Sequence, residues 1–295
     1  MKIEINQISS PILNQKDINF FIKRIDKIQP FISGNKWYKL KYNLDYAKQK
    51  GYDTILTFGG SYSNHILATS YACKENNFKC IGIIRGEEHQ NLNATLEFAR
   101  NNGMFLYYIS RYKYRLKDTV GFLEDLKLKF GNFYLIPEGG SNDLAIKGTS
   151  EILDKYDTQD YICCPVGTGG TIIGLINTQL SFQNVIGFPV INNSLYIEDK
   201  VSSVVNNNNF TFINDYKIGG YAKYNESLIN FINDFYEIHN IPLDIIYTGK
   251  MIYGIFDLVY NDFFPRGSSI LAIHTGGIQG NRGMIDRFDI KLPLK

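Results

Sequence analysis

The sequence predicts an α/β protein built on a mostly parallel sheet. Short runs of β-branched and aromatic residues alternate with longer stretches of helical periodicity, which is typical of βαβ units. Glycine-rich turns follow several of these runs, at points where a strand would pass directly into a helix. With 295 residues, 44% of them hydrophobic, the chain can bury one large core or two adjoining ones.

The first half of the chain contains four strand–helix units. The first is a strand over residues 54–58 with a helix over 64–76. Three similar units follow, with strands at 80–84, 105–109 and 133–136 and helices at 92–101, 117–130 and 143–156. Because helices of this length connect the strands, we expect the strands to lie parallel.

The second half of the chain continues the alternation. Strands are predicted at 161–165, 185–188 and 270–273, and helices at 170–180, 225–239, 251–262 and after Gly277. Four consecutive asparagines at 206–209 have no apolar face to bury and indicate a surface loop. No repeat or Pro/Ser-rich linker divides the chain, so two domains would require it to pass between them more than once.

Charge and hydropathy point to a cytoplasmic protein that binds small molecules. The formal net charge of +2 provides no electrostatic footprint for nucleic acid or anionic lipid. Charged residues are scattered through residues 1–17, where a secretory signal would carry an apolar segment. The most apolar stretch, residues 161–176, is interrupted by Pro165 and several glycines and is too short to span a bilayer.

Cysteine and histidine spacing predicts reduced thiols and no metal site. The cysteines show no C-x-x-C pair, and the histidines show no metal-binding spacing. The residues concerned are Cys73, Cys80, Cys163, Cys164, His65, His89, His239 and His274.

Lys36 is the first candidate for chemistry. Residues 33–36, S-G-N-K, precede a predicted helix that begins near Trp37. A lysine at a helix start is most often a solvated cation. The positive end of the helix dipole and partial burial beside Trp37 would both lower its pKa, however, and so favour the neutral amine that a covalent cofactor link needs.

Two glycine-rich turns are further candidates. In G-G-S-Y-S-N-H, residues 59–65, Ser63 and Asn64 would project at the carboxyl end of a strand, although either could simply cap the following helix. In P-V-G-T-G-G-T, residues 165–171, consecutive backbone amides at a helix start would bind a phosphate, aided by Thr168 and Thr171. Neither turn matches the nucleoside triphosphate or dinucleotide motifs, so a single phosphate ester fits better.

The remaining signals are G-Y-A at 220–222, Y-T-G-K at 247–250 and H-T-G-G at 274–277. Tyrosine is abundant here, with 21 copies, so each tyrosine alone is more often a packing residue than a catalytic one. Taken singly, none of these motifs decides a function.

Together and in this order, the motifs resemble those of the 1-aminocyclopropane-1-carboxylate deaminase and D-cysteine desulfhydrase family of pyridoxal-phosphate enzymes. The likeness extends from S-P at positions 10–11 to Gly277. It implies two open, twisted, mostly parallel sheets flanked by helices, which is the tryptophan synthase β-like fold (fold type II). It also implies pyridoxal 5'-phosphate as cofactor, a small amino acid as substrate and a homodimer.

The resemblance assigns roles residue by residue. Lys36, in G-N-K-x-x-K-L, corresponds to the lysine that holds the cofactor and later moves protons. Ser63 corresponds to a substrate-facing serine, and Asn64 to the asparagine that binds the 3-oxygen of the cofactor. Tyr221 and Tyr247 correspond to two tyrosines near the substrate. The phosphate loop would comprise Gly167, Thr168, Gly169, Gly170 and Thr171.

Two cofactor-side positions resemble the desulfhydrase branch. Deaminases have Y-E-G-K and H-L-G-G, whereas this chain has Thr248 and Thr275 in the corresponding places. A glutamate against the pyridine nitrogen would favour its protonated form and strengthen the electron sink, and Thr248 carries no such charge. His65 follows Asn64 where deaminases commonly have glutamine.

The expected reaction is therefore β-elimination from D-cysteine, which releases hydrogen sulfide, pyruvate and ammonia. Lys36 is the first choice for the base that removes the Cα proton, with Ser63 and Tyr247 as relays. Two alternatives stay open: a 1-aminocyclopropane-1-carboxylate deaminase, and a non-catalytic cofactor-binding or regulatory protein of the same fold. By resemblance, a smaller domain over residues 44–143 is inserted into a larger one formed by 1–43 and 144–295.

Overall fold

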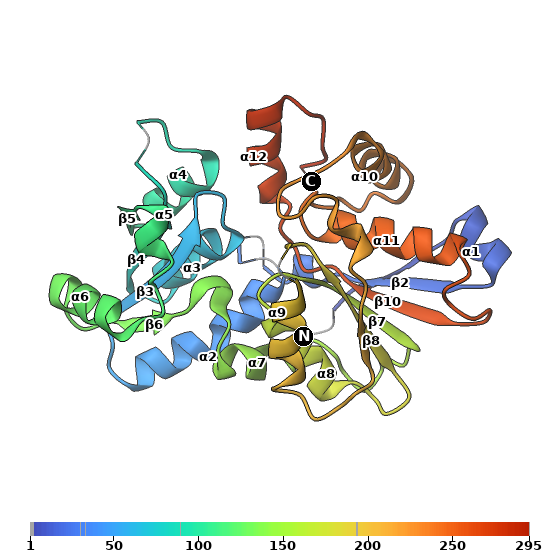
Figure 1. Ribbon diagram of the computed structural model, residues 1–295, viewed down its shortest axis with the longest axis horizontal. Coiled ribbons are helices and arrows are strands. Elements are labelled where there is room, and N and C mark those ends of the chain that lie inside the picture. The colour runs from blue at the N-terminus through green and yellow to red at the C-terminus, as the bar shows by residue number, and fades with distance from the viewer. Residues whose placement is uncertain (1–2, 30, 33, 89, 193, 295) are drawn as a thin grey trace.

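The computed structural model describes residues 3–29, 31–32, 34–88, 90–192 and 194–294. It contains a six-stranded and a four-stranded sheet, each with helices on both faces (Figure 1). The predicted α/β class with two open, mostly parallel sheets is confirmed. Position 33 and His89, both named above, lie outside the described residues.

The six-stranded sheet combines strands from both ends of the chain in the order β1-β2-β10-β7-β8-β9. Its strands are β1 (Ile5–Ile8), β2 (Asn19–Lys23), β7 (Tyr161–Val166), β8 (Asn184–Pro189), β9 (Phe210–Phe212) and β10 (Ser269–Ile273). The β1–β2 pair is antiparallel, and the other pairs are parallel. Its turns after β7 and β10 therefore lie at one edge.

The four-stranded sheet is parallel throughout and has the order β5-β4-β3-β6. Its strands are β3 (Thr54–Gly60), β4 (Lys79–Arg85), β5 (Met104–Ile109) and β6 (Tyr134–Ile136). In the β3–β4 register, Gly60 lies opposite Arg85, so both strands end at the same level. The turn after β3 is thus beside the side chain of Arg85.

Helices cover both faces of both sheets. They are α1 (Pro11–Lys16), α2 (Asn35–Gln49), α3 (Asn64–Glu75), α4 (Ala94–Asn101), α5 (Arg111–Tyr114), α6 (Val120–Phe130), α7 (Asp143–Thr149), α8 (Gly170–Thr178), α9 (Ser194–Ser202), α10 (Glu226–His239), α11 (Thr248–Tyr260) and α12 (Gln279–Phe288). Within β7, Cys163 packs toward one core, and Ile162 and Cys164 pack toward the other. This two-sided burial explains why the parallel strands are continuously apolar. The four cysteines are buried free thiols, as predicted.

Helix α2 packs against the cores of both sheets. Tyr38 belongs to a core of the six-stranded sheet, whereas Leu40 and Leu44 belong to a core of the four-stranded sheet. Trp37, next to Lys36, packs against both of these cores, so the first turn of α2 lies at the junction of the two sheets (Figure 1). The domain limits at residues 44 and 143 stay a prediction.

Several elements differ from the sequence expectations. The predicted helix over 143–156 ends at Thr149, and the chain then turns so that the carboxylate of Asp157 can pair with the buried ammonium of Lys23. The strands β1, β2 and β9 and the helices α1 and α9 were not predicted. These elements are short, and their burial patterns depend on neighbours that are distant in the sequence.

Within the described ranges, no helix has both the length and the apolar character needed to cross a bilayer.

Candidate active site

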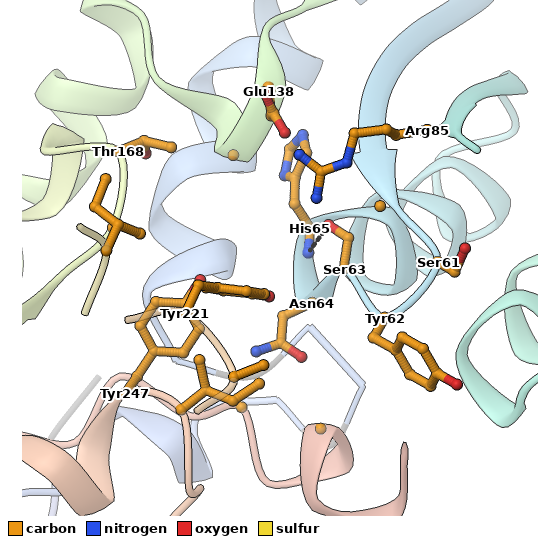
Figure 2. A pocket seen from close by; sticks show the side chains of 18 of the residues that line it. Ser61, Tyr62, Ser63, Asn64, His65, Arg85, Glu138, Thr168, Tyr221 and Tyr247 are labelled. Carbon is orange, nitrogen blue, oxygen red and sulfur yellow. Dashed lines mark hydrogen bonds between the residues drawn. The ribbon is translucent and has the colours of Figure 1, made fainter. Parts of the chain in front are cut away.

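A cleft of about 2080 Å³ separates the carboxyl ends of the two sheets. The turns after β3, β7 and β10 line it, together with the first turn of α2 and the approach to α11 (Figure 2). Most of the predicted site residues are brought together here, namely Lys36, Ser63, Asn64, Gly167, Thr168, Gly169, Thr171, Tyr221, Tyr247 and Thr275. Gly170 and Thr248 are not among the residues that line the cleft.

Lys36 is held at the cleft by the backbone around it. Gly34 has φ of 65° and packs so tightly against the carbonyl of Thr275 that a Cβ would overlap it. Asn35 then donates its backbone amide to that carbonyl over 3.3 Å and its side-chain amide to the Thr171 hydroxyl over 2.8 Å. Burial lowers the pKa of Lys36 to about 8. Lys36 is therefore positioned between the turns after β7 and β10 with a substantial neutral fraction near neutral pH.

The turn after β7 presents donors toward the cleft. Gly169 takes a left-handed conformation, with φ of 86°, immediately before α8 begins at Gly170. The first amides of α8 have no carbonyl partner within the helix, and Gly169 and Thr171 on either side of Gly170 line the cleft. The Thr168 hydroxyl lies 2.5 Å from the Ser141 hydroxyl, on the turn that follows β6. This arrangement is suited to an anion at the start of α8.

Lys39 is a functional candidate whose role was not inferred from the sequence. It is 2% exposed, and its ammonium donates to the Gly139 carbonyl over 3.0 Å, the Ser141 hydroxyl over 3.2 Å and the Thr168 hydroxyl over 3.4 Å. Burial, followed by the charge of Lys36, places the pKa of Lys39 well below its ordinary value. The K-x-x-K spacing was visible in the sequence and places both lysines on one face of α2.

Ser63 and Asn64 lie where the turn after β3 enters α3, and Asn64 also contacts α12. The Ser63 hydroxyl accepts from the amides of His65 over 3.2 Å and Ile66 over 3.3 Å, so it caps α3 while it also lines the cleft. Asn64 accepts from the side chain of Gln279 over 3.1 Å. Its amide nitrogen is so near Gly277 that a Cβ there would lie 2.9 Å away. Capping and functional exposure are thus compatible for Ser63.

Tyr221 and Tyr247 face each other in the cleft. Their rings are 6.1 Å apart and nearly perpendicular, and Figure 2 shows both beside Asn64. Burial raises the pKa of Tyr221, an effect that the neighbouring Tyr247 hydroxyl opposes. Burial also raises the pKa of Tyr247 well above its ordinary value, and the charge of Tyr221 adds to this. Both hydroxyls are therefore protonated near neutral pH and can donate hydrogen bonds.

Thr248 is bonded to a buried carboxylate outside the cleft. Its hydroxyl donates to Asp244 over 2.7 Å and accepts from the Asp244 amide over 2.9 Å. Asp244 also accepts from the backbone amides of Ile246, Tyr247 and Thr248 over 2.8–3.0 Å. Burial raises the pKa of Asp244, and these hydrogen bonds oppose the rise. The hydrogen-bonded pair of Asp244 and Thr248 therefore holds the backbone in place on both sides of Tyr247. Asp244 was not identified from the sequence.

Lys250 fixes the segment that carries Tyr221. Its ammonium is 1% exposed and donates to the carbonyls of Lys217 over 2.6 Å and Gly220 over 2.7 Å. Gly220 has φ of 106°, and a Cβ there would overlap the side chain of Asn192. The first turn of α11 therefore determines the positions of Tyr247 and, through Lys250, of Tyr221.

The donors around the turn after β7 fit a phosphate group. The turn carries the hydroxyls of Thr168 and Thr171 and leads into the first amides of α8. The buried ammonium of Lys39 lies beside it. Lys39 forms no ion pair within the described part of the chain. A buried cation whose hydrogen-bond partners are all neutral acceptors is costly unless an anion accompanies it. The residues present therefore fit a phosphorylated cofactor that is linked to Lys36.

Comparison with known proteins agrees with this geometry. Residues 4–276 match the model of the family described as pyridoxal-phosphate dependent enzyme. A Thermotoga maritima protein, provisionally named a 1-aminocyclopropane-1-carboxylate deaminase, is 33% identical over 95% of this chain and 97% of its own length. An Arabidopsis thaliana mitochondrial protein, named as a bifunctional D-cysteine desulfhydrase and 1-aminocyclopropane-1-carboxylate deaminase, is 30% identical over 90% of this chain and 74% of its own.

A solved structure shares the fold. The crystal structure of a homologue of 1-aminocyclopropane-1-carboxylate deaminase superposes with a TM-score of 0.82 and 27% identity, covering 97% of this chain and 93% of that one. The prediction of fold type II, with pyridoxal 5'-phosphate as cofactor, is confirmed. The chain therefore belongs to the pyridoxal-phosphate-dependent enzyme family, as a lyase of the group that contains the 1-aminocyclopropane-1-carboxylate deaminases and D-cysteine desulfhydrases.

Proposed function

We propose that this enzyme catalyses β-elimination from D-cysteine and releases hydrogen sulfide, pyruvate and ammonia. The observation that carries the proposal is the uncharged Thr248, in the place where deaminases of the family have glutamate. Its hydroxyl is hydrogen-bonded to Asp244, and the residue does not line the cleft. Without a carboxylate in that place, the site is better suited to a substrate with a good leaving group than to opening of a cyclopropane ring.

The proposal assigns a role to each side chain in the cleft. The hydroxyls of Thr168 and Thr171, the amides that begin α8 and the Lys39 ammonium would hold the phosphate of the cofactor, and Asn64 its 3-oxygen. When bound, the cofactor supplies an electron sink for the substrate's α-carbon. Lys36 would form the covalent link at the junction of the two sheets and leave it when substrate binds.

Lys36 is also the proposed base for the Cα proton. Its pKa of about 8 is near the operating pH, which suits an amine that accepts a proton and later returns it. Loss of that proton is coupled to cleavage of the Cβ–S bond, and the sulfur leaves with the bonding electron pair. The protonated Tyr247 hydroxyl and the Ser63 hydroxyl, which both line the cleft, would act as proton relays to the sulfur. The aminoacrylate that is released decays in water to pyruvate and ammonia.

A deaminase of 1-aminocyclopropane-1-carboxylate is the second candidate. It is favoured by the names of the curated relatives, one of which combines both activities. In that case 2-oxobutyrate, rather than pyruvate and sulfide, would be the product. The homodimer implied by the family resemblance stays a prediction, which sedimentation analysis can test.

The deciding experiment measures keto acid and sulfide in parallel. Purified enzyme that contains the cofactor is mixed with D-cysteine, L-cysteine and 1-aminocyclopropane-1-carboxylate. We expect equal amounts of pyruvate and sulfide from D-cysteine, and loss of both the yellow colour and the activity in Lys36→Ala. Turnover of the cyclopropane substrate with none of D-cysteine would decide for the second candidate.

A further inference from the structure

Arg85 is the last residue of β4. Its side chain passes over Gly60, the last residue of β3, and lines the cleft. It lies opposite Gly60 in the parallel register, and its guanidinium nitrogen would be 3.2 Å from a Cβ on that residue. Figure 2 shows the guanidinium between Glu138 and Ser63, close to the turn that leads into α3. Because Gly60 has no side chain, Arg85 can approach this turn closely.

The guanidinium of Arg85 also contacts an aromatic ring. Its guanidinium carbon is 5.4 Å from the ring centroid of Tyr114, which is 3% exposed. An arginine stacks well on such a ring while it keeps its N–H groups available in the plane. The side chain is therefore held between Gly60 and Tyr114 without using its hydrogen-bond donors.

The charge of Arg85 is not neutralised by a carboxylate among the described residues. No acidic side chain there lies within 4.0 Å of the guanidinium. Glu138, across from it, pairs with Lys117 over 3.5 Å. Burial raises the pKa of Tyr221, and the charge of Arg85 opposes that rise, so the field of the cation extends to the substrate side of the cleft. Glu87 and Glu88 also line the cleft, and neither carboxylate lies within 4.0 Å of the guanidinium.

A substrate amino acid has two groups that Arg85 could meet. In the proposed function, the Ser63 hydroxyl faces the substrate's α-carboxylate; this hydroxyl accepts from the amides of His65 and Ile66 and keeps its own proton to donate. Arg85 approaches the same turn from the side of Gly60, so it can meet a second anionic group of a substrate whose α-carboxylate lies at Ser63. Arg85 is exposed and has no acidic partner among the described residues, so an anionic substituent would gain a charge-assisted hydrogen bond there that a neutral one would not.

We propose that Arg85 is a specificity-determining residue that binds the anionic β-substituent of the substrate. This inference rests on the proposed function, in which the β-substituent of D-cysteine leaves as a thiolate. Arg85 would donate hydrogen bonds to the sulfur and stabilise its negative charge as the Cβ–S bond breaks. The inference names the substrate class as small amino acids whose β-substituent is anionic or becomes so on departure.

Aspartate and asparagine test the inference by binding alone, because they have nearly the same shape and differ in the charge of the β-substituent. Binding of each to the cofactor-loaded enzyme is followed by the absorbance of the cofactor, with the D and L pairs measured separately. For the enantiomer that the enzyme binds, we expect the wild type to bind aspartate at least roughly tenfold more tightly than asparagine. Arg85→Gln should bring the ratio close to one, and Arg85→Lys should retain part of it.

Arg287→Gln is the matched control, because Arg287 is another arginine that lines the cleft, from α12. It should leave the ratio unchanged. The inference would be overturned if the wild type bound aspartate and asparagine equally for both enantiomers, or if Arg85→Gln kept the preference for aspartate. The D-cysteine assay separates the two proposals: if sulfide is not formed but the aspartate preference depends on Arg85, the reaction assignment fails and the recognition of an anionic substituent stands.

Discussion

Lys250 donates a 2.7 Å hydrogen bond to the carbonyl of Gly220, the residue that precedes Tyr221. A second bond, of 2.6 Å, goes to the carbonyl of Lys217. The same helical turn that begins after Tyr247 thus secures the segment that carries the other tyrosine of the cleft. Two aromatic hydroxyls that are separated in sequence are positioned by one structural unit.

Lys250→Met should lower kcat more than it changes KM. Methionine has a similar length but cannot donate to either carbonyl, so Tyr221 loses its anchor, and a shift of a catalytic group by about 1 Å can cost roughly a hundredfold in rate. We expect a reduction of kcat by roughly tenfold to a hundredfold, measured with D-cysteine. Lys223→Met, an exposed lysine on the same segment, is the control. Equal losses in both variants would contradict a specific anchoring role.

Lys39→Met should weaken cofactor binding while leaving the apoenzyme at least as stable. The pKa of Lys39 lies well below its ordinary value because burial, followed by the charge of Lys36, disfavours the ammonium, so the charged form of Lys39 destabilises the cofactor-free fold. Its removal should cost roughly tenfold or more in cofactor affinity, which equilibrium dialysis measures. Thermal unfolding of the apoenzyme should show no loss.

Lys41→Met is the control for Lys39, because Lys41 lies on the same helix and pairs with Glu151 at the surface. It should leave cofactor affinity unchanged. Unaltered affinity in Lys39→Met would show that the phosphate is held elsewhere.

Asp244→Asn should be far more damaging than Thr248→Val. The carboxylate of Asp244 accepts hydrogen bonds from three backbone amides and the Thr248 hydroxyl, and an asparagine would turn a donor toward some of these donors. We expect about 1–3 kcal/mol of lost stability and a lower kcat through displacement of Tyr247. Thr248→Val loses the two hydrogen bonds between its hydroxyl and Asp244 but leaves the three amide bonds to the carboxylate, so its effect on unfolding by urea should be smaller.

A greater loss of stability in Thr248→Val than in Asp244→Asn would contradict this account of the Tyr247 approach.

The rate at which the apoenzyme captures its cofactor should rise with pH and level off above pH 9. Burial lowers the pKa of Lys36 to about 8, and only the neutral amine attacks the aldehyde. The neutral fraction grows from about a tenth at pH 7 to about a half at pH 8, so the rate should rise about fivefold over that interval. The yellow absorbance after rapid mixing measures the rate. A tenfold rise per pH unit that continues beyond pH 9 would indicate an amine with an ordinary pKa.

Local pattern was sufficient to locate the strand–helix units and the residues at their junctions. The predicted strands at 54–58 and 161–165 correspond to β3 and β7, and the turns that follow them carry Ser63 and Thr168 into the cleft. Periodicity and glycine placement are properties of neighbouring residues, so they can be recognised without a structure. The order of the motifs likewise indicated the family.

The contacts across the cleft could not be predicted in the same way. Lys39 meets Gly139 and Ser141, which are about a hundred positions away, and Lys250 meets the carbonyls of Lys217 and Gly220, which are about thirty positions away. Such contacts depend on how two sheets and their connecting helix pack together.

The sequence by itself determined the alternation of strands and helices, the lysine at the start of α2 and the glycine turns that expose backbone amides, because each follows from the conformational preferences of adjacent residues. Only the tertiary structure decided that Thr248 bonds to Asp244, that Lys39 is buried beside the turn after β7 and that Arg85 crosses Gly60. The direction of a long polar side chain depends on which donors, acceptors and free space the fold brings near it, and these come from distant parts of the chain.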